Sequence, residues 1–173
     1  MSKRFLLVLA VCIAGLGLIF WTTKGSDSDT SPNSSNTTVS SHIRGKGQKK
    51  VTLLEYGDFQ CPACKSFHSI VKAIVAKYQN DITFQFRHFP LVSIHPNAFA
   101  ASRAAEAAGK QDKFWEMHDL LYEQQDLWAS TNSPVATFEG YAQQLGLDAA
   151  KFKADYSSSS VNDTINADTK AGN

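Results

Sequence analysis

Two cysteines, Cys61 and Cys64, stand where an expected strand ends and an expected helix begins. The residues before them, 51–56, form a short apolar run of strand-forming side chains. Pro62 suits the first turn of a helix, where its missing N–H leaves no hydrogen bond unmade. Beyond it, apolar residues recur at spacings of three and four as far as Tyr78, which predicts an amphipathic helix. The chain therefore needs a fold that joins a strand directly to a helix opening on a Cys-x-x-Cys pair.

This position predicts thiol–disulfide chemistry. Cys61 is expected at the helix N-terminus, where unpaired N–H groups and the helix dipole stabilise a thiolate. Cys64 lies one turn further on the same face, near enough to close a small disulfide ring. In exchange with a partner, Cys61 forms the mixed disulfide and Cys64 resolves it. Half of a zinc site and an inert structural disulfide are the competing interpretations.

A zinc site at the pair would need two further ligands. Only His68 lies nearby in the sequence, the third cysteine is Cys12, and no second Cys/His pair exists. We therefore expect neither a metal ion nor a cofactor.

Four segments resemble the membrane-anchored, DsbA-like thiol–disulfide oxidoreductases of the thioredoxin superfamily: EYGDFQCPAC, FRHFPL, IHPNAFAASRAAEAAG and KFWEMHDLLYEQQDLW. The resemblance covers about Arg44 to Lys153. It implies an α/β thioredoxin-like fold with a helical insertion, with Cys61 as nucleophile and Cys64 as resolving thiol. It also maps the family's buried acidic residue onto Glu55, where a carboxylate would take the resolving thiol's proton. The competing interpretation of Glu55 is a solvated residue on a strand face.

Residues 1–23 are interpreted as a targeting segment. Lys3 and Arg4 precede seventeen uncharged, mainly apolar residues, 5–21. This length is at the lower limit for a membrane-spanning helix and slightly long for a signal-peptide core. The basic pair favours a cytoplasmic N-terminus and an extracytoplasmic domain. We favour an uncleaved single-pass anchor in the cell membrane over a cleaved signal that would release a secreted or periplasmic protein.

Residues 24–42 are rich in Ser, Thr and Asn and too polar to form a core, so we expect a flexible linker. The DsbA-like domain is then expected over residues 43–173. The whole chain has 17 basic and 16 acidic residues. This balance argues against a nucleic-acid-binding protein, which would show a basic excess.

After the motif helix, residues 81–89 alternate apolar and polar side chains, which predicts a second, parallel strand and a βαβ unit. A short third strand is expected near Val39 to Ile43. His88, at the end of the second strand, is expected to pack or form a hydrogen bond rather than act at the redox site. Helices are predicted for the rest of the chain, with His118 as a core histidine on one of them.

Beyond Phe89 no strand-like alternation remains. DsbA-like proteins continue after the helical insertion with a strand preceded by a cis-proline, another strand and a final helix. All five prolines here lie at or before Pro134. We therefore expect that the C-terminal strands and final helix are missing and that the sequence is a fragment. A degenerate relative is the alternative.

The leading hypothesis is an extracytoplasmic oxidase that forms disulfides in exported proteins and is reoxidised by a membrane redox partner. The compartment favours oxidation, because thiols outside the cytosol are not kept reduced by default. A disulfide reductase or isomerase is the second hypothesis. The third is a redox-inactive, tethered binding or chaperone module, which would apply if the chain ends at residue 173.

The dipeptide Pro62-Ala63 offers no cation or imidazole to a Cys61 thiolate, unlike the Pro-His of the best-known DsbA-like members. Stabilising the thiolate stabilises the reduced form and makes a stronger oxidant. We therefore predict that Ala63→His shifts the redox potential to a more oxidising value. Equilibration of both proteins with glutathione buffers measures the change. An unchanged or more reducing potential would contradict the prediction.

Overall fold

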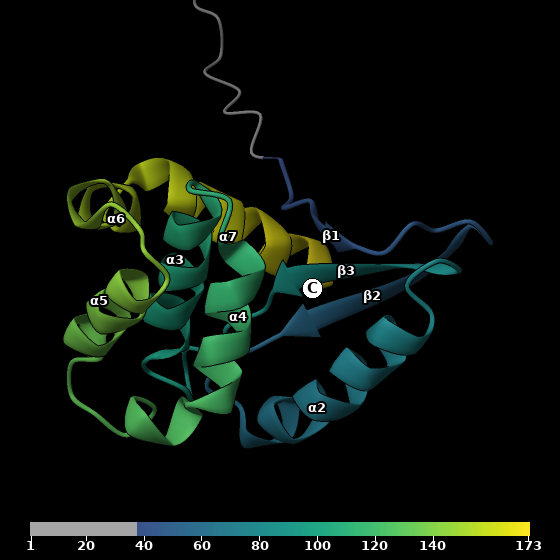
Figure 1. Cartoon of the computed structure of the whole chain (residues 1–173). Coiled ribbons are helices and arrows are strands. Elements are labelled where there is room, and N and C mark those ends of the chain that lie inside the picture. Colours follow the sequence, from purple (N-terminus) through teal and green to yellow (C-terminus); the bar gives the residue numbers. More distant parts are fainter. Residues whose placement is uncertain (1–37) are drawn as a thin grey trace, which may run out of the picture. The chain divides into compact units, whose positions relative to one another are not determined.

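The computed structural model describes residues 38–173 as a three-stranded mixed sheet with six α-helices around it (Figure 1). The elements are β1 (His42–Arg44), β2 (Val51–Gly57), α2 (Pro62–Lys77), β3 (Ile82–His88), α3 (Ala98–Gly109), α4 (Phe114–Glu123), the short 3₁₀ helix η1 (Gln125–Leu127), α5 (Val135–Gln144), α6 (Ala149–Tyr156) and α7 (Ser159–Gly172). None of the helices in this range is long and apolar enough to span a membrane. The predicted anchor and Cys12 lie outside the described residues.

The predicted βαβ unit is confirmed. β2 and β3 are parallel, with Val51 opposite Ile82 and Gly57 opposite His88, and α2 connects them. β1 pairs antiparallel with the other edge of β3, which gives the order β1-β3-β2. The third strand therefore exists, but it covers His42–Arg44 rather than Val39 to Ile43. The carboxyl ends of β2 and β3 meet at one end of the sheet, where the cysteine pair follows.

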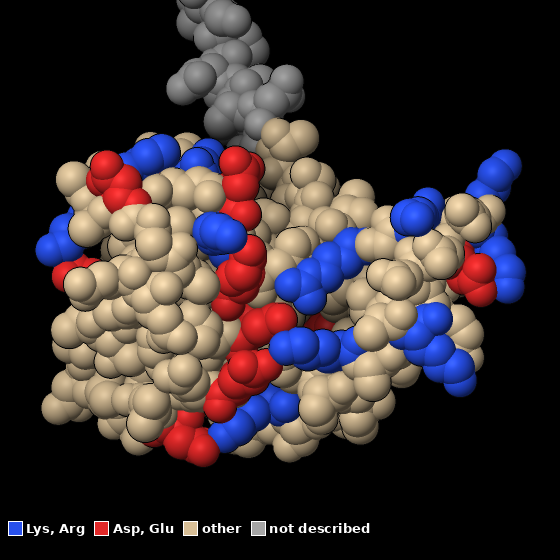
Figure 2. All heavy atoms as spheres, viewed as in Figure 1, with Lys and Arg blue, Asp and Glu red and all other residues tan. Residues whose placement is uncertain are grey.

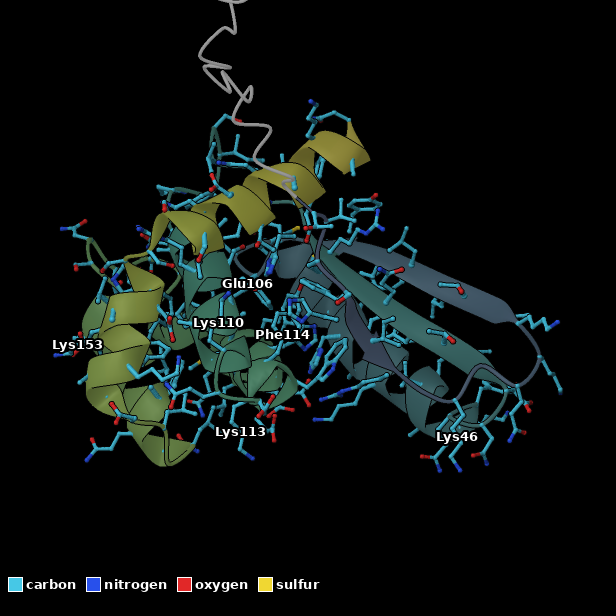
Figure 3. All side chains as sticks on the ribbon, turned by 90° about the horizontal axis from the view of Figure 1, so that it is seen from above. Lys46, Glu106, Lys110, Lys113, Phe114 and Lys153 are labelled. Carbon is cyan, nitrogen blue, oxygen red and sulfur yellow. The ribbon has the colours of Figure 1, made fainter. Side chains whose placement is uncertain are left out.

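The core lies between the sheet and the cluster formed by α3, α4 and α5. Phe59 stacks on Phe86 with ring centroids 5.3 Å apart and contacts Tyr122 at 4.9 Å. α3 contributes mainly alanines, and the small side chains let neighbouring helices approach closely. In Figure 3, Glu106 of α3 and Phe114 of α4 lie close together in the interior, whereas Lys46 and Lys153 lie at the periphery.

Buried apolar side chains and one buried carboxylate anchor α7 to the rest of the domain. Val161 and Ile165 are fully buried. Asp168 is also fully buried, and its carboxylate accepts hydrogen bonds from the Ser40 N–H at 2.7 Å and the His88 N–H at 3.0 Å. Ser40 belongs to the range expected for the linker. The Asp168 carboxylate thus holds Ser40 against β3.

The apolar stripe predicted for the motif helix forms, but only Val71 and Val75 of it pack into the core, and the rest faces solvent. Phe67 is 62% exposed and Ile70 is 52% exposed, and Leu54 on the free edge of β2 is 41% exposed. No element of residues 38–173 covers this face. The expectation that further strands and a final helix follow the helical insertion remains a prediction.

Ion pairs join α2 to α4 and η1. Figure 2 shows acidic side chains in a stripe down the middle of one face, with basic side chains beside them. Lys72 contacts Asp119 at 3.1 Å and Glu123 at 2.8 Å, and Lys65 contacts Asp126 at 2.6 Å. Exposed pairs of this kind contribute little stability, so packing rather than charge holds the helices together.

Gly57 leaves no room for a side chain at the end of β2. A Cβ atom there would overlap the Phe86 ring and lie 2.7 Å from the Tyr122 hydroxyl. We predict that Gly57→Ala lowers the free energy of unfolding by about 1–3 kcal/mol, because overpacking displaces core rings. Urea denaturation measures the change.

Gly140 in α5 is the matched control, because a Cβ atom there meets nothing within 4 Å. Gly140→Ala should stabilise the protein by about 0.5–1 kcal/mol through the better helix propensity of alanine. Equal effects of the two substitutions would contradict the packing at Gly57.

Candidate active site

The cysteine pair opens α2 as predicted. Cys61 is the N-cap residue, with extended backbone angles of −70° and 123°, and Pro62 occupies the first turn. The Cys61 carbonyl accepts the N–H of Lys65 at 3.1 Å, which closes that turn. Cys61 and Cys64 are free thiols, both partly exposed. The nucleophile position therefore combines access from solvent with the unpaired N–H groups of a helix N-terminus.

Asp58 braces the loop that leads to Cys61. Its side chain is 3% exposed, and its Oδ1 accepts the Gln60 N–H at 2.7 Å. Its Oδ2 accepts the Leu91 N–H at 2.9 Å and lies 2.7 Å from His95 Nδ1. The Asp58 carbonyl accepts the Cys61 N–H at 3.2 Å. One buried carboxylate thus connects the loop of residues 58–61, the redox loop, to the loop after β3.

Glutamine side chains fix the same loop to the helical region. Gln60 accepts the Asn97 N–H at 2.6 Å and donates to the Ala129 carbonyl at 2.7 Å. Gln125 donates to the carbonyls of Phe59 at 2.7 Å and Cys61 at 3.1 Å. The backbone on the N-terminal side of the thiol is therefore held by donors and acceptors from three segments, which limits its movement during exchange.

The two thiols differ in electrostatic environment. Burial raises the pKa of Cys64 to about 11, a hydrogen bond and repulsion from Cys61 add to this, and a backbone hydrogen bond from Asp58 opposes it. Near neutral pH Cys64 is thus held as a thiol. This asymmetry suits a pair in which Cys61 meets the partner and Cys64 reacts second, once a base removes its proton.

Glu55 is half-buried on β2, rather than the fully solvated residue of the competing interpretation. Burial raises the pKa of its carboxyl group. Together with Cys64 it lines a pocket of about 330 Å³ between β2 and the first turns of α2. Ala63, Phe67 and Leu54 supply much of the apolar lining. Glu55, the predicted proton acceptor, and Cys64, the predicted resolving thiol, therefore line the same cavity.

The histidines singled out from the sequence lie elsewhere. His88 is fully buried and forms a hydrogen bond with Glu106 at 2.8 Å. His118 is buried and bonds to Asp119 at 3.0 Å, and burial lowers its pKa to about 4, against the opposing effect of Asp119. Both are core histidines, as expected.

The residues that sequence reasoning missed are those that hold the loop: Asp58, Gln60, His95, Asn97 and Gln125. No local pattern marks them, because apart from the Asp58–Gln60 contact their partners lie 31 to 69 positions away in the chain. Among the described residues, two other groups bring potential metal ligands together: His42, His88 and Glu106, and His68, His118 and Asp119.

Comparison with proteins of known sequence places the domain. The family model described as Thioredoxin matches residues 37–173. Among curated proteins, the Na(+)/H(+) antiporter NhaA 1 of Salinispora arenicola is 43% identical over 112 residues, which are 65% of this chain and 16% of that protein. NhaA 1 of Mycolicibacterium gilvum is 40% identical over 116 residues, 66% of this chain and 18% of that protein. The chain thus spans less than a fifth of these relatives.

Solved structures share the fold. Wolbachia pipientis α-DsbA1 matches with a TM-score of 0.67 at 21% identity, over 76% of this chain and 67% of that one. Oxidised BdbD from Bacillus subtilis matches with a TM-score of 0.64 at 24% identity, over 75% and 72%. A thioredoxin-like oxidoreductase from Silicibacter pomeroyi gives 0.61 at 24%, over 76% and 70%. The predicted thioredoxin-like fold is confirmed, and the chain belongs to the thioredoxin family.

Proposed function

We propose that this protein is a thiol–disulfide oxidoreductase that works through the Cys61–Cys64 pair. The observation that carries the proposal is the pair's geometry: a partly exposed cysteine at a helix N-terminus, one turn from a second cysteine that burial keeps protonated. The family and the fold support the same chemistry. We do not propose antiporter activity for this protein, because the matched segment is a small part of the relatives that bear that name.

We further propose that the reaction runs as an oxidation of exported proteins. A substrate thiolate attacks Cys61 of the oxidised pair, the Cys61–Cys64 bond breaks, and Cys64 leaves and takes up a proton. A second substrate thiolate then attacks the mixed disulfide. The substrate leaves oxidised and the pair is left as a dithiol, so a membrane redox partner must reoxidise it.

The surface beside the pair suits unfolded polypeptides. Phe67, exposed on α2, lies on one side, and Val92 and Ile94, 58% and 67% exposed, follow β3 in the loop that Asp58 holds. Exposed apolar side chains next to a reactive thiol favour protein segments over small polar thiols as substrates. We place the domain outside the cytoplasm, tethered through residues 5–21, as the sequence of the targeting segment predicts.

The cysteine roles predict separable phenotypes. In a Cys12→Ser background, Cys61→Ser should abolish insulin reduction and oxidative refolding of a reduced substrate. Cys64→Ser should instead accumulate a mixed disulfide at Cys61, because the resolving thiol is gone. Non-reducing gels and mass spectrometry measure both.

The comparison of the two assays separates the candidate functions. Faster refolding than reduction supports an oxidase, and the reverse supports a reductase or isomerase. A folded protein with reactive thiols and no turnover in either assay would favour the redox-inactive module.

Glu55→Gln tests the proposed proton acceptor. In insulin reduction, the attack of Cys64 on the mixed disulfide should slow, because the amide cannot take the Cys64 proton. The fold should also gain stability at pH 7.5: burial raises the pKa of Glu55, so the folded state bears a cost of ionisation that the variant lacks. This gain should shrink as the pH falls and Glu55 becomes protonated in both states.

Stopped-flow kinetics and urea midpoints at pH 7.5 and pH 4 measure these effects. Glu139→Gln, a carboxylate on α5 that pairs with Lys153 at 3.0 Å, is the control and should leave the kinetics unchanged. Normal resolution rates in Glu55→Gln would rule out the relay.

A further inference from the structure

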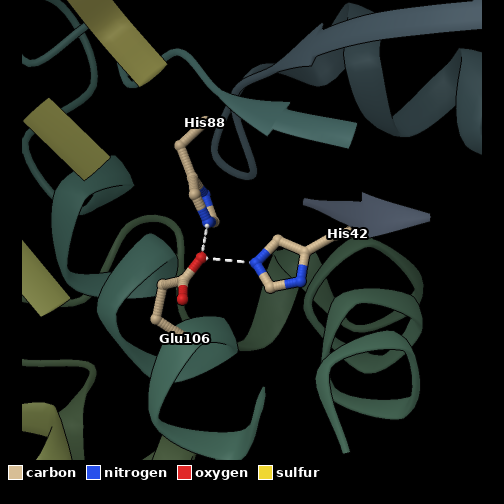
Figure 4. A group of neighbouring side chains, drawn as sticks. All are labelled: His42, His88 and Glu106. Atoms are coloured by element: carbon tan, nitrogen blue, oxygen red, sulfur yellow. Dashed lines mark hydrogen bonds and ion pairs between the residues drawn. The ribbon is translucent and has the colours of Figure 1, made fainter. Parts of the chain in front are cut away.

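Three side chains that the redox chemistry does not use converge in the interior, behind the sheet end (Figure 4). His42 comes from β1, His88 from the end of β3 and Glu106 from the middle of α3. The Nε2 atoms of the two histidines lie 2.6 Å and 2.8 Å from the same Glu106 oxygen, Oε1. Two imidazoles and a carboxylate from three elements thus face one point.

Packing holds these groups in place. The His42 ring stacks on Phe114, with centroids 3.3 Å apart and planes 6° apart. The His88 side chain is fully buried and Glu106 is 7% exposed, whereas His42 is 19% exposed. The group is therefore preorganised in the core, and among the described residues that form it His42 is the most accessible to solvent.

We propose that His42, His88 and Glu106 form a binding site for one Zn²⁺ ion. Two imidazole nitrogens and one carboxylate oxygen are a ligand set that zinc takes with water in the fourth position. Calcium and magnesium prefer oxygen ligands throughout, so they do not suit two histidines. Zinc in this position would join β1, β3 and α3 and so stabilise the fold.

Among the described residues, the ion-pair partners of Glu106 are these two histidines, and no Lys or Arg pairs with its carboxylate. In the second group, by contrast, Asp119 already pairs with Lys72 at 3.1 Å and Arg44 at 3.7 Å.

Zinc would take the place of the hydrogens between the ligands. Bonds of about 2.0 Å in a tetrahedral site separate the ligand atoms by about 3.3 Å, so each histidine must move outward by roughly half an ångström. His42, 19% exposed, is the more accessible of the two histidines. The hydrogen bond to Glu106 keeps the His88 proton on Nε2, so zinc binding there would move that proton to Nδ1, which is buried without a partner among the described residues.

The test uses the full chain, without a histidine tag, kept soluble in detergent and stripped with a chelator. All three cysteines are replaced by serine, so that thiols cannot bind the metal and failure of the redox function does not affect the result. Calorimetric titration with zinc chloride should show one equivalent bound at micromolar affinity or tighter, and zinc should raise the melting temperature. Cobalt(II) should bind with the visible d–d absorption of a tetrahedral site that has nitrogen and oxygen ligands.

His42→Gln should weaken zinc binding at least tenfold, since it removes one ligand. Its partial exposure makes it the variant expected to fold, and Glu106→Gln is the stricter version. Asp119→Asn controls for the second group and should bind as the parent does. Absence of zinc binding by the parent, equal binding by the folded His42→Gln variant, or loss of binding in Asp119→Asn would overturn the proposal.

Discussion

The buried carboxylate of Asp58 is the interaction on which the candidate active site depends. A carboxylate is tolerated in an interior only when donors replace the water it loses. Here two backbone N–H groups and the His95 ring do so, and all of them belong to the two loops at the sheet end. The same contacts that make the charge tolerable therefore set the position of the residues just before Cys61. Without these contacts the helix N-terminus would still exist, but the backbone that presents the Cys61 thiol to a partner would not be fixed in position.

Two further buried carboxylates, Glu106 and Asp168, connect the helical region to the sheet. Glu106 of α3 contacts histidines of β1 and β3, and Asp168 of α7 accepts N–H groups of Ser40 and His88. Hydrogen bonds to charged groups contribute about 1.5–3 kcal/mol each, and leaving such a group unsatisfied costs more. The helices are thus attached to the sheet by specific polar contacts as well as by alanine and aromatic packing, which selects one docking arrangement among those that apolar contact alone would allow.

The sequence was sufficient where the structure is local. A strand, a proline in the first helical turn and a Cys-x-x-Cys pair follow each other within one segment, so β2, α2 and the position of Cys61 could be predicted. The sites of Asp58, Glu106 and Asp168 could not. In the sequence, Asp58 is one polar residue between the expected strand and the cysteine pair, and Glu106 is one polar residue in an alanine-rich segment. Their roles come from partners brought close by the fold, and hydropathy periodicity carries no information about such pairs. The predicted position of β1 was wrong by a few residues, because a strand of three residues leaves almost no hydropathy pattern.

The redox loop and the group of His42, His88 and Glu106 lie at the same end of the sheet. This follows from the parallel pairing of β2 and β3. Parallel strands place their carboxyl ends side by side, where the following loops gather functional residues. Gly57 ends one strand and His88 ends the other, directly opposite it. Phe59 then packs its ring 5.9 Å from the His88 ring, two residues before Cys61. The group of His42, His88 and Glu106 is therefore connected to the backbone that presents the thiol by one aromatic contact and one strand pair.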